Sequence, residues 1–160
     1  MTARSVHIVS GEQSFRGGPE TSHMCTQYLI PIDDSEPSWE AFAHALETDP
    51  DGEFTVLHVI DPLRGDYMLG AEQNDVTRRS ETLSEEVAEY LADTAVATEQ
   101  VSIVVEEGQP ENRIVSAAEE REVDHIVIGS RGRSGLSRVL LGSVAETVVR
   151  RAPVPVTVVR

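Results

Sequence analysis

The stretch HIVIGSRGRSGLSRVLLGS, residues 125–143, decides the fold. It begins with a run of β-branched apolar residues that is typical of a buried strand. Four glycines, four serines and three arginines follow within residues 129–143, and a helical pattern starts at Ser143. A buried strand, a glycine-rich turn and a helix in succession indicate one repeating unit of a parallel sheet in an α/β protein.

The same alternation extends along the rest of the chain. Strands are predicted at residues 28–32, 54–60, 101–106, 125–128 and 154–159, and helices begin near residues 35, 76, 110 and 143, the second running to residue 97 and the last to residue 150. Parallel neighbours need crossover connections, so we expect a five-stranded parallel sheet with helices on both faces. Ligands of such sheets bind beyond the carboxyl ends of the strands, which points to the loops after Ile32, Ile60 and Ile128.

The length of 160 residues fits one domain. Residues 1–23 mix glycine and proline with polar residues and are predicted to be a disordered arm, followed by a single domain over residues 24–160. We hypothesise that translation starts at Met24. No apolar run approaches the roughly 20 residues of a membrane span, and the single cysteine, Cys25, agrees with a reducing compartment. We therefore expect a cytoplasmic protein.

The charge of the chain is strongly negative. The net charge is −15, and all 13 basic residues are arginine. A surface rich in carboxylates and devoid of lysine is typical of proteins that stay hydrated in concentrated salt, where repulsion is screened, so we hypothesise a halophilic source; a merely acidic mesophilic protein is the alternative. The acidity also argues against nucleic acid as a partner, because phosphate contacts need a clustered basic face.

The glycine-rich stretch has the chemistry of a phosphate site. Gly129, Gly132 and Gly135 leave backbone N–H groups open to an anion, and Gly142-Ser143 opens a helix whose first N–H groups are unpaired. Arginines 131, 133 and 138 add positive charge. Two alternatives remain open: the glycines form only a tight turn, or Ser143 and Glu146 form only a capping box.

Two common nucleotide motifs are excluded. A Walker P-loop requires a lysine, which this chain lacks. A dinucleotide fingerprint requires glycines directly after the first strand, which here ends in IPIDDSE.

The spacing of Gly129, Gly132, Gly142 and Ser143 resembles the signature of the universal stress proteins, specifically of their ATP-binding branch. The resemblance extends from residue 27 to residue 160, through LIPIDDSE, VLHVID and APVPVTVVR. It implies a Rossmann-like fold of the adenine nucleotide alpha hydrolase type, an adenine nucleotide as ligand, and a homodimer built on the C-terminal edge strand.

The resemblance also implies a set of nucleotide-binding residues. Asp33, beside Pro31 and Ile32, corresponds to the acid near the adenosine, and Val59 to the apolar wall of the adenine slot. Positions near the ribose and the phosphates correspond to Ile128, Gly129, Gly132, Gly142, Ser143 and Val144, with Arg133 adding charge. As alternatives, Asp33 only caps the following helix and Val59 is ordinary core; Asp34 is interpreted as a helix-start residue.

Three functions remain in view. The first is a regulatory module of the stress response that binds ATP, with Mg²⁺ or Mn²⁺ bridging the phosphates, and acts through protein partners that the sequence does not name. The second is a slow ATP hydrolase, although no base or γ-phosphate lysine is visible. The third is a nucleotide-independent interaction module of the same fold. The histidines, including His58 and His125, show no metal-binding spacing and are predicted to be structural or exposed.

Self-association is expected at the last strand. Its sequence VPVTVVR is rich in β-branched residues, and an unpaired edge strand of this kind invites pairing with a second copy.

Overall fold

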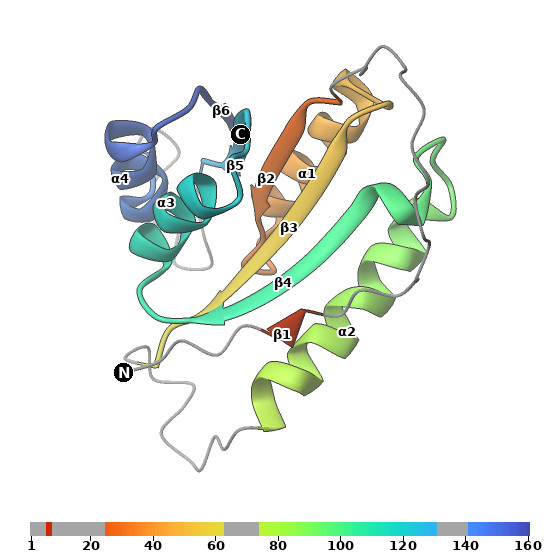
Figure 1. The fold of residues 1–160 in the computed structure, drawn as a ribbon, viewed down its shortest axis with the longest axis horizontal. Coiled ribbons are helices and arrows are strands. Elements are labelled where there is room, and N and C mark those ends of the chain that lie inside the picture. Colours follow the sequence, from red (N-terminus) through yellow and green to blue (C-terminus); the bar gives the residue numbers. More distant parts are fainter. Residues whose placement is uncertain (1–5, 8–24, 63–73, 131–140) are drawn as a thin grey trace, which may run out of the picture.

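The computed structural model of the chain describes residues 6–7, 25–62, 74–130 and 141–160 (Figure 1). In this part of the chain six strands form one sheet in the order β1-β4-β3-β2-β5-β6. The five strands β2 to β6 are parallel, and each is joined to the next through a crossover. Their bounds are Gln27–Pro31 (β2), Glu53–Ile60 (β3), Val101–Glu107 (β4), His125–Gly129 (β5) and Val156–Val159 (β6). The predicted five-stranded parallel sheet is confirmed.

The sixth strand, β1 (Val6–His7), was not expected from the sequence. It pairs with β4 in the antiparallel direction, with Val6 opposite Val105. These two residues fall within the segment predicted to be a disordered arm. The rest of residues 1–23 lies outside the described residues, where the arm stays a prediction.

Four α-helices connect the parallel strands in the described part of the chain: α1 (Glu36–Thr48), α2 (Asn74–Leu91), α3 (Pro110–Glu120) and α4 (Ser143–Arg151). A short 3₁₀ helix, η2 (Thr98–Gln100), precedes β4. The α2 helix ends six residues earlier than predicted. The backbone N–H and the side-chain hydroxyl of Thr94 both donate to the carbonyl oxygen of Leu91, and this local hydrogen bonding competes with continuation of the helix.

The last strand begins at Val156 rather than at residue 154 as predicted. Pro153 and Pro155 lack the N–H groups that a ladder requires. The carbonyl oxygen of Pro155 still accepts a hydrogen bond from the N–H of Ile126, at 3.0 Å, so pairing starts at this proline.

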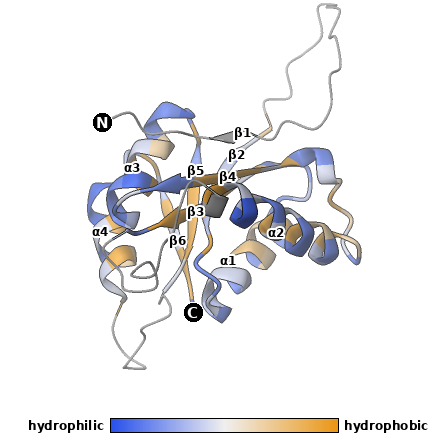
Figure 2. Cartoon of the chain, turned by 90° about the horizontal axis from the view of Figure 1, so that it is seen from below, coloured by the Kyte–Doolittle hydropathy of each residue, from blue (hydrophilic) through white to orange (hydrophobic). Residues whose placement is uncertain are grey.

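The sheet is covered on both faces, as Figures 1 and 2 show. On one face, α1 and α2 contribute Phe42, Leu46, Leu83 and Val87 to a buried cluster. On the other face, α3 and α4 contribute Ile114 and other apolar residues to a second buried cluster. The strands between them are apolar along most of their length, as expected for strands buried on both sides (Figure 2).

Candidate functional site

The strand order reverses between β2 and β5. From β2 the chain continues to α1 on one face of the sheet, whereas from β5 it continues to α4 on the other face. Open α/β sheets bind their ligands in a crevice beyond the carboxyl ends of the strands at such a reversal, so the candidate site lies there. Of the three loops predicted to form the site, those after Ile32 and Ile128 border this crevice.

The turn between β2 and α1 holds the first group of predicted residues. Pro31 and Ile32 are buried, and Asp33 is half-buried. The Asp33 carboxylate accepts hydrogen bonds from Ser35, at 3.2 Å from its backbone N and 2.5 Å from its hydroxyl. Ser35 is the N-cap residue of α1. The alternative that Asp33 itself caps the helix is therefore wrong: its carboxylate holds the residue that occupies the cap.

The end of β5 lies against the first turn of α1. A Cβ atom added to Gly129 would lie 2.7 Å from the carbonyl carbon and oxygen of Pro37 and 2.8 Å from the nitrogen of Ser38. Atoms do not approach so closely, so only glycine permits this packing. The N-terminus of α1 is thereby brought directly beside the end of β5.

The ends of the glycine-rich segment meet at the same place. The N–H of Ser130 donates to the carbonyl oxygen of Val159 at 2.6 Å, and the N–H of Gly142 donates to the carbonyl oxygen of Ser130 at 2.8 Å. Ser130 is buried, and its hydroxyl has no hydrogen-bond partner within the described ranges. Sequence reasoning missed this residue. Gly132 and Arg133, with Gly135, Arg131 and Arg138, lie outside the described residues.

The start of α4 differs from the capping-box alternative. Gly142, with φ −65° and ψ 152°, is the N-cap residue, and Ser143 is the first residue of the helix. A capping box needs a side-chain oxygen at the N-cap, which glycine does not have, so that alternative is wrong. The Ser143 side chain is exposed at the helix N-terminus.

The predicted apolar residues share one face of the sheet. Ile128 is a member of the cluster beneath α3 and α4, and the half-buried side chains of Val59 and Val144 pack against the same cluster. Val59 is therefore partly core, as the alternative interpretation proposed, and it also lies one residue before the carboxyl end of β3.

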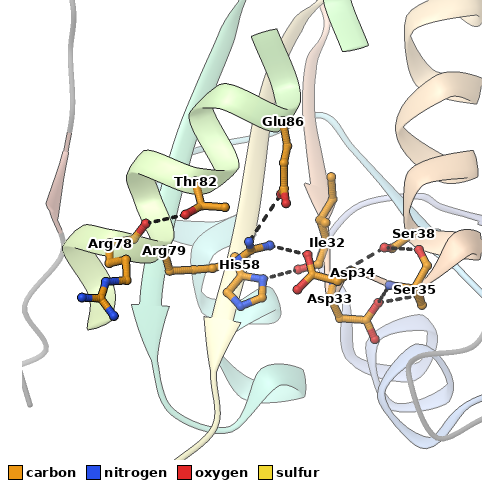
Figure 3. Close-up of polar contacts among 10 residues, drawn as sticks. All are labelled: Ile32, Asp33, Asp34, Ser35, Ser38, His58, Arg78, Arg79, Thr82 and Glu86. Carbon is orange, nitrogen blue, oxygen red and sulfur yellow. Dashed lines mark hydrogen bonds and ion pairs between the residues drawn. The ribbon is translucent and has the colours of Figure 1, made fainter. Parts of the chain in front are cut away.

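A polar cluster that the sequence did not indicate joins the β2–α1 turn to β3 and α2 (Figure 3). His58 Nδ1 lies 2.8 Å from the carbonyl oxygen of Ile32 and donates a hydrogen bond to it. Burial is the main cause that lowers the pKa of His58 below its usual value of 6.5, and the positive charge of Arg79 adds to it. A neutral ring with its proton on Nδ1 fits the structural role predicted for this histidine.

Arg79 of α2 forms an ion pair with Asp34, and its second terminal nitrogen lies 3.3 Å from a carboxylate oxygen of Glu86. Asp34 has φ 65°, in the left-handed region. It precedes the N-cap residue of α1, in agreement with its interpretation as a helix-start residue. No sequence pattern could reveal its partner, which lies 45 positions further along the chain.

Within the described ranges, no group of three or more histidine, cysteine, aspartate or glutamate side chains could hold a metal ion. None of the helices seen in those ranges is long and apolar enough to cross a membrane.

Comparison with known proteins identifies the class. A model of the universal stress protein family matches residues 24–160. Universal stress protein MJ0531 of Methanocaldococcus jannaschii is 37% identical over 145 residues, which cover 82% of this chain and 80% of the relative. This chain therefore belongs to the universal stress protein family, as the resemblance had implied.

Solved structures agree with this assignment. Universal stress protein MJ0577 of the same organism is 31% identical over 160 residues, covering 87% of this chain and 97% of the relative. Its structure matches with a TM-score of 0.66 over 85% of this chain and 96% of that chain. A universal stress protein in complex with cAMP matches with a TM-score of 0.64 and 19% identity over 84% of this chain and 97% of that chain, a likeness of fold alone.

Proposed function

We propose that the protein is a regulatory module of the stress response that binds ATP in the crevice between β2 and β5. The observation that carries the proposal is the meeting of two helix N-termini at the end of β5. The first turn of α1 lies against Gly129, and α4 begins directly after Gly142, whose N–H is bonded to Ser130. A helix N-terminus carries partial positive charge, which both helices direct toward this edge of the sheet. In α1, Pro37 has no N–H group and the N–H of Ser38 donates to the carbonyl oxygen of Ser35, so the unpaired N–H groups for a phosphate come chiefly from the start of α4.

The adenosine would lie toward β2 and β3. Val59, Ile128 and Val144 belong to one apolar face and supply a wall for the base. The Asp33 carboxylate, in the turn after β2, supplies an acceptor for the ribose hydroxyls or the exocyclic amine. An apolar wall with a few placed polar groups is typical of small-molecule sites. Pro31 and Ile32 hold the turn in place as buried residues.

The phosphates would lie over the glycine-rich segment. Gly129, Gly142 and Ser143 border its two ends, and Gly132 and Arg133 complete the proposed set. The Ser130 hydroxyl fits an anionic ligand there, because it is a buried polar group without a partner in the described part of the chain. We assign a bridging Mg²⁺ or Mn²⁺ to the phosphates of the nucleotide, since divalent ions of this kind are held largely by substrate phosphates.

Two other functions compete with this one. A slow ATP hydrolase would need a group that stabilises charge on the γ-phosphate, and the chain has no lysine to do so. A nucleotide-independent interaction module would explain Gly129 by its packing against Pro37 and Gly142 by its place at the N-cap of α4, but it gives no reason for the spacing of the whole signature. The complex of a relative of the same fold with cAMP, an adenine nucleotide, also favours nucleotide binding.

We further propose a homodimer formed through β6. All four residues of this strand are half-exposed, and β6 pairs with β5 on one side only in the described part of the chain. Unpaired strand edges favour association with another copy. The acidic, lysine-free composition and the single cysteine support our proposals of a halophilic source and a cytoplasmic location.

The test is the nucleotide content of the freshly purified protein, measured by ion-exchange chromatography of the supernatant after denaturation. The variant Gly142→Val, Ser143→Ala alters the start of α4. Val149→Ala is the matched control, because Val149 is 46% exposed on the same helix, away from its N-terminus. We expect ATP or ADP with the wild type and the control, and neither with the double variant.

Added ATP should also bind to the wild type in concentrated salt, as measured by calorimetry. Absence of bound nucleotide together with absence of binding would contradict the proposal and favour the interaction module. Release of phosphate from bound ATP, lost in the double variant, would favour the hydrolase.

A further inference from the structure

We propose that Arg79 of α2 is a positioning residue for the nucleotide site: through its ion pair with Asp34 it fixes the turn that presents Asp33. This inference rests on the proposed function, because it concerns the orientation of a carboxylate assigned to the adenosine. Arg79 and the Asp33 carboxylate lie on opposite sides of the turn (Figure 3), and Arg79 is not itself placed in contact with the nucleotide.

The turn is anchored at three successive residues. The carbonyl oxygen of Ile32 accepts a hydrogen bond from His58, the carboxylate of Asp33 accepts from Ser35, and the carboxylate of Asp34 pairs with Arg79. Figure 3 shows the two neighbouring carboxylates pointing in opposite directions, Asp34 toward Arg79 and Asp33 toward Ser35. The ion pair on one side therefore constrains the orientation of the carboxylate on the other side.

The backbone at Asp34 makes this anchor necessary. Its φ of 65° lies in the left-handed region, which is unfavourable for a residue with a Cβ atom. Such a conformation persists only where surrounding contacts hold it. The ion pair with Arg79 joins the Asp34 side chain to a helix outside the turn, so it supplies such a restraint.

The surroundings of Arg79 strengthen the pair. The Arg79 side chain is 17% exposed and lies between Asp34 and Glu86, whereas the Asp34 side chain is 38% exposed, so the pair is shielded from solvent on the Arg79 side. An ion pair that is partly shielded from solvent is screened less by salt than a surface pair, and this difference matters for a protein proposed to work in concentrated salt. The neighbouring His58, whose pKa is lowered, adds no competing positive charge when it is neutral.

The expected consequence is selective. Loss of the Arg79 charge frees the turn to adopt other conformations, so the Asp33 carboxylate is no longer held toward the adenosine. At the phosphate end, Gly142 and Ser143 are held by α4, and the first turn of α1 is held separately by its close packing against Gly129, so we expect this end to change little. Binding of ATP should therefore weaken while binding of inorganic tripolyphosphate should not, a difference that a general loss of stability would not produce.

The experiment measures the affinity of the wild type, Arg79→Gln and Arg78→Gln for ATP and for tripolyphosphate by calorimetry in concentrated salt. Arg78 is the matched control, because it is the preceding residue of α2, carries the same charge, is exposed and points away from the turn (Figure 3). Arg79→Gln should weaken ATP binding about tenfold, in line with coupling through a neighbouring pair. Arg78→Gln should leave both affinities unchanged.

Two further variants test the pair itself. Arg79→Lys keeps the positive charge and should recover part of the ATP affinity. Asp34→Asn removes the partner charge with a residue that tolerates positive φ, and it should weaken ATP binding like Arg79→Gln. The double variant Asp34→Asn, Arg79→Gln should bind ATP no more weakly than either single variant, because the two residues act as one unit.

The outcomes separate this inference from the proposed function. If the wild type binds neither ATP nor tripolyphosphate, the proposed function fails. If the wild type and Arg79→Gln bind ATP equally well, the positioning role is overturned. It is also overturned if Arg79→Gln is folded by circular dichroism but loses affinity for ATP and for tripolyphosphate to the same extent.

Discussion

Gly129 and Pro37 approach each other so closely that an added Cβ atom on Gly129 would lie 2.7 Å from the Pro37 carbonyl carbon. This contact sets the distance between the end of β5 and the start of α1, the two segments that border the candidate site. Gly129 was singled out in the sequence for its exposed N–H group; the structure adds a packing reason for the same glycine. A side chain at this position would force α1 away from the sheet.

Gly129→Ala should therefore destabilise the fold. Overpacking of a close contact costs about 2 kcal/mol, and here the colliding atoms are backbone atoms that cannot rotate away. Denaturant unfolding in concentrated salt measures the effect, with Ser102→Ala at an exposed position of β4 as the control. Equal midpoints for Gly129→Ala and the wild type would show that α1 adjusts without cost.

The Glu106 carboxylate is the centre of a second polar cluster, and its removal should also destabilise the protein. Glu106 is 3% exposed; Arg113 Nε lies 2.7 Å from one of its carboxylate oxygens, and an Arg121 nitrogen lies 4.0 Å from the other. Glu106→Gln leaves two half-buried guanidinium groups without a counter-charge, which we expect to lower the free energy of unfolding by about 3 kcal/mol.

The matched control is Glu107→Gln, which removes the same charge from an exposed position on the same strand. It should change the free energy of unfolding by less than about 0.5 kcal/mol. Similar losses in both variants, measured by urea unfolding, would mean that net charge rather than the buried pair is responsible.

His58 should make stability depend on pH. Burial, and next the charge of Arg79, lower its pKa below 6.5 in the folded state, whereas Asp34 and Asp33 act in the opposite direction without outweighing them. Below pH 6.5 the unfolded chain therefore binds a proton that the folded protein does not. The free energy of unfolding should fall from pH 6.5 toward the folded pKa, by at most about 1.4 kcal/mol per pH unit.

His58→Asn keeps a donor for the Ile32 carbonyl oxygen but does not titrate, so its stability should fall less steeply in this window. The comparison includes His125→Asn, because burial also lowers the pKa of His125. It also includes His44→Asn as a control at an exposed position of α1. Identical slopes for His58→Asn and the wild type would contradict the assignment of this dependence to His58.

The fold was predictable because its signals are local. Each buried strand is a short apolar run, and Ser35 and Pro110 mark the starts of α1 and α3. The errors concern the ends of helices and strands, where a single residue shifts the boundary of the element. Thr94 ends α2 early, and Pro155 delays the start of β6 to Val156.

The site was predictable only in part. Its glycine signature and Asp33 directly follow strands that the apolar runs in the sequence predict, so their place at the edge of the sheet could be predicted too. The contacts of Asp34 with Arg79 and of Ile32 with His58 join residues 45 and 26 positions apart, respectively. Such pairs depend on the placement of α2 and β3 in space, for which no local pattern exists. Ser130 was missed because a serine in a glycine-rich segment looks like loop until its burial is seen.

The hydrogen bonds of β6 allow a direct test of the proposed dimer. The carbonyl oxygens of Pro155 and Val159 accept from Ile126 and Ser130 of the β5 side. Backbone groups alternate in direction along a strand, so the N–H and C=O groups of Val156 and Val158 face the outer edge. A second copy would pair with these groups.

Val158→Pro removes one outward N–H group and keeps an apolar side chain of similar size, and proline is tolerated where the N–H faces away from the sheet. We expect the mass measured by light scattering to fall from that of a dimer to that of a monomer. Val158→Ala shortens the side chain but keeps the N–H group, so it should remain dimeric. A dimer that survives Val158→Pro would place the interface elsewhere on the molecule, because pairing along β6 cannot continue past a missing donor.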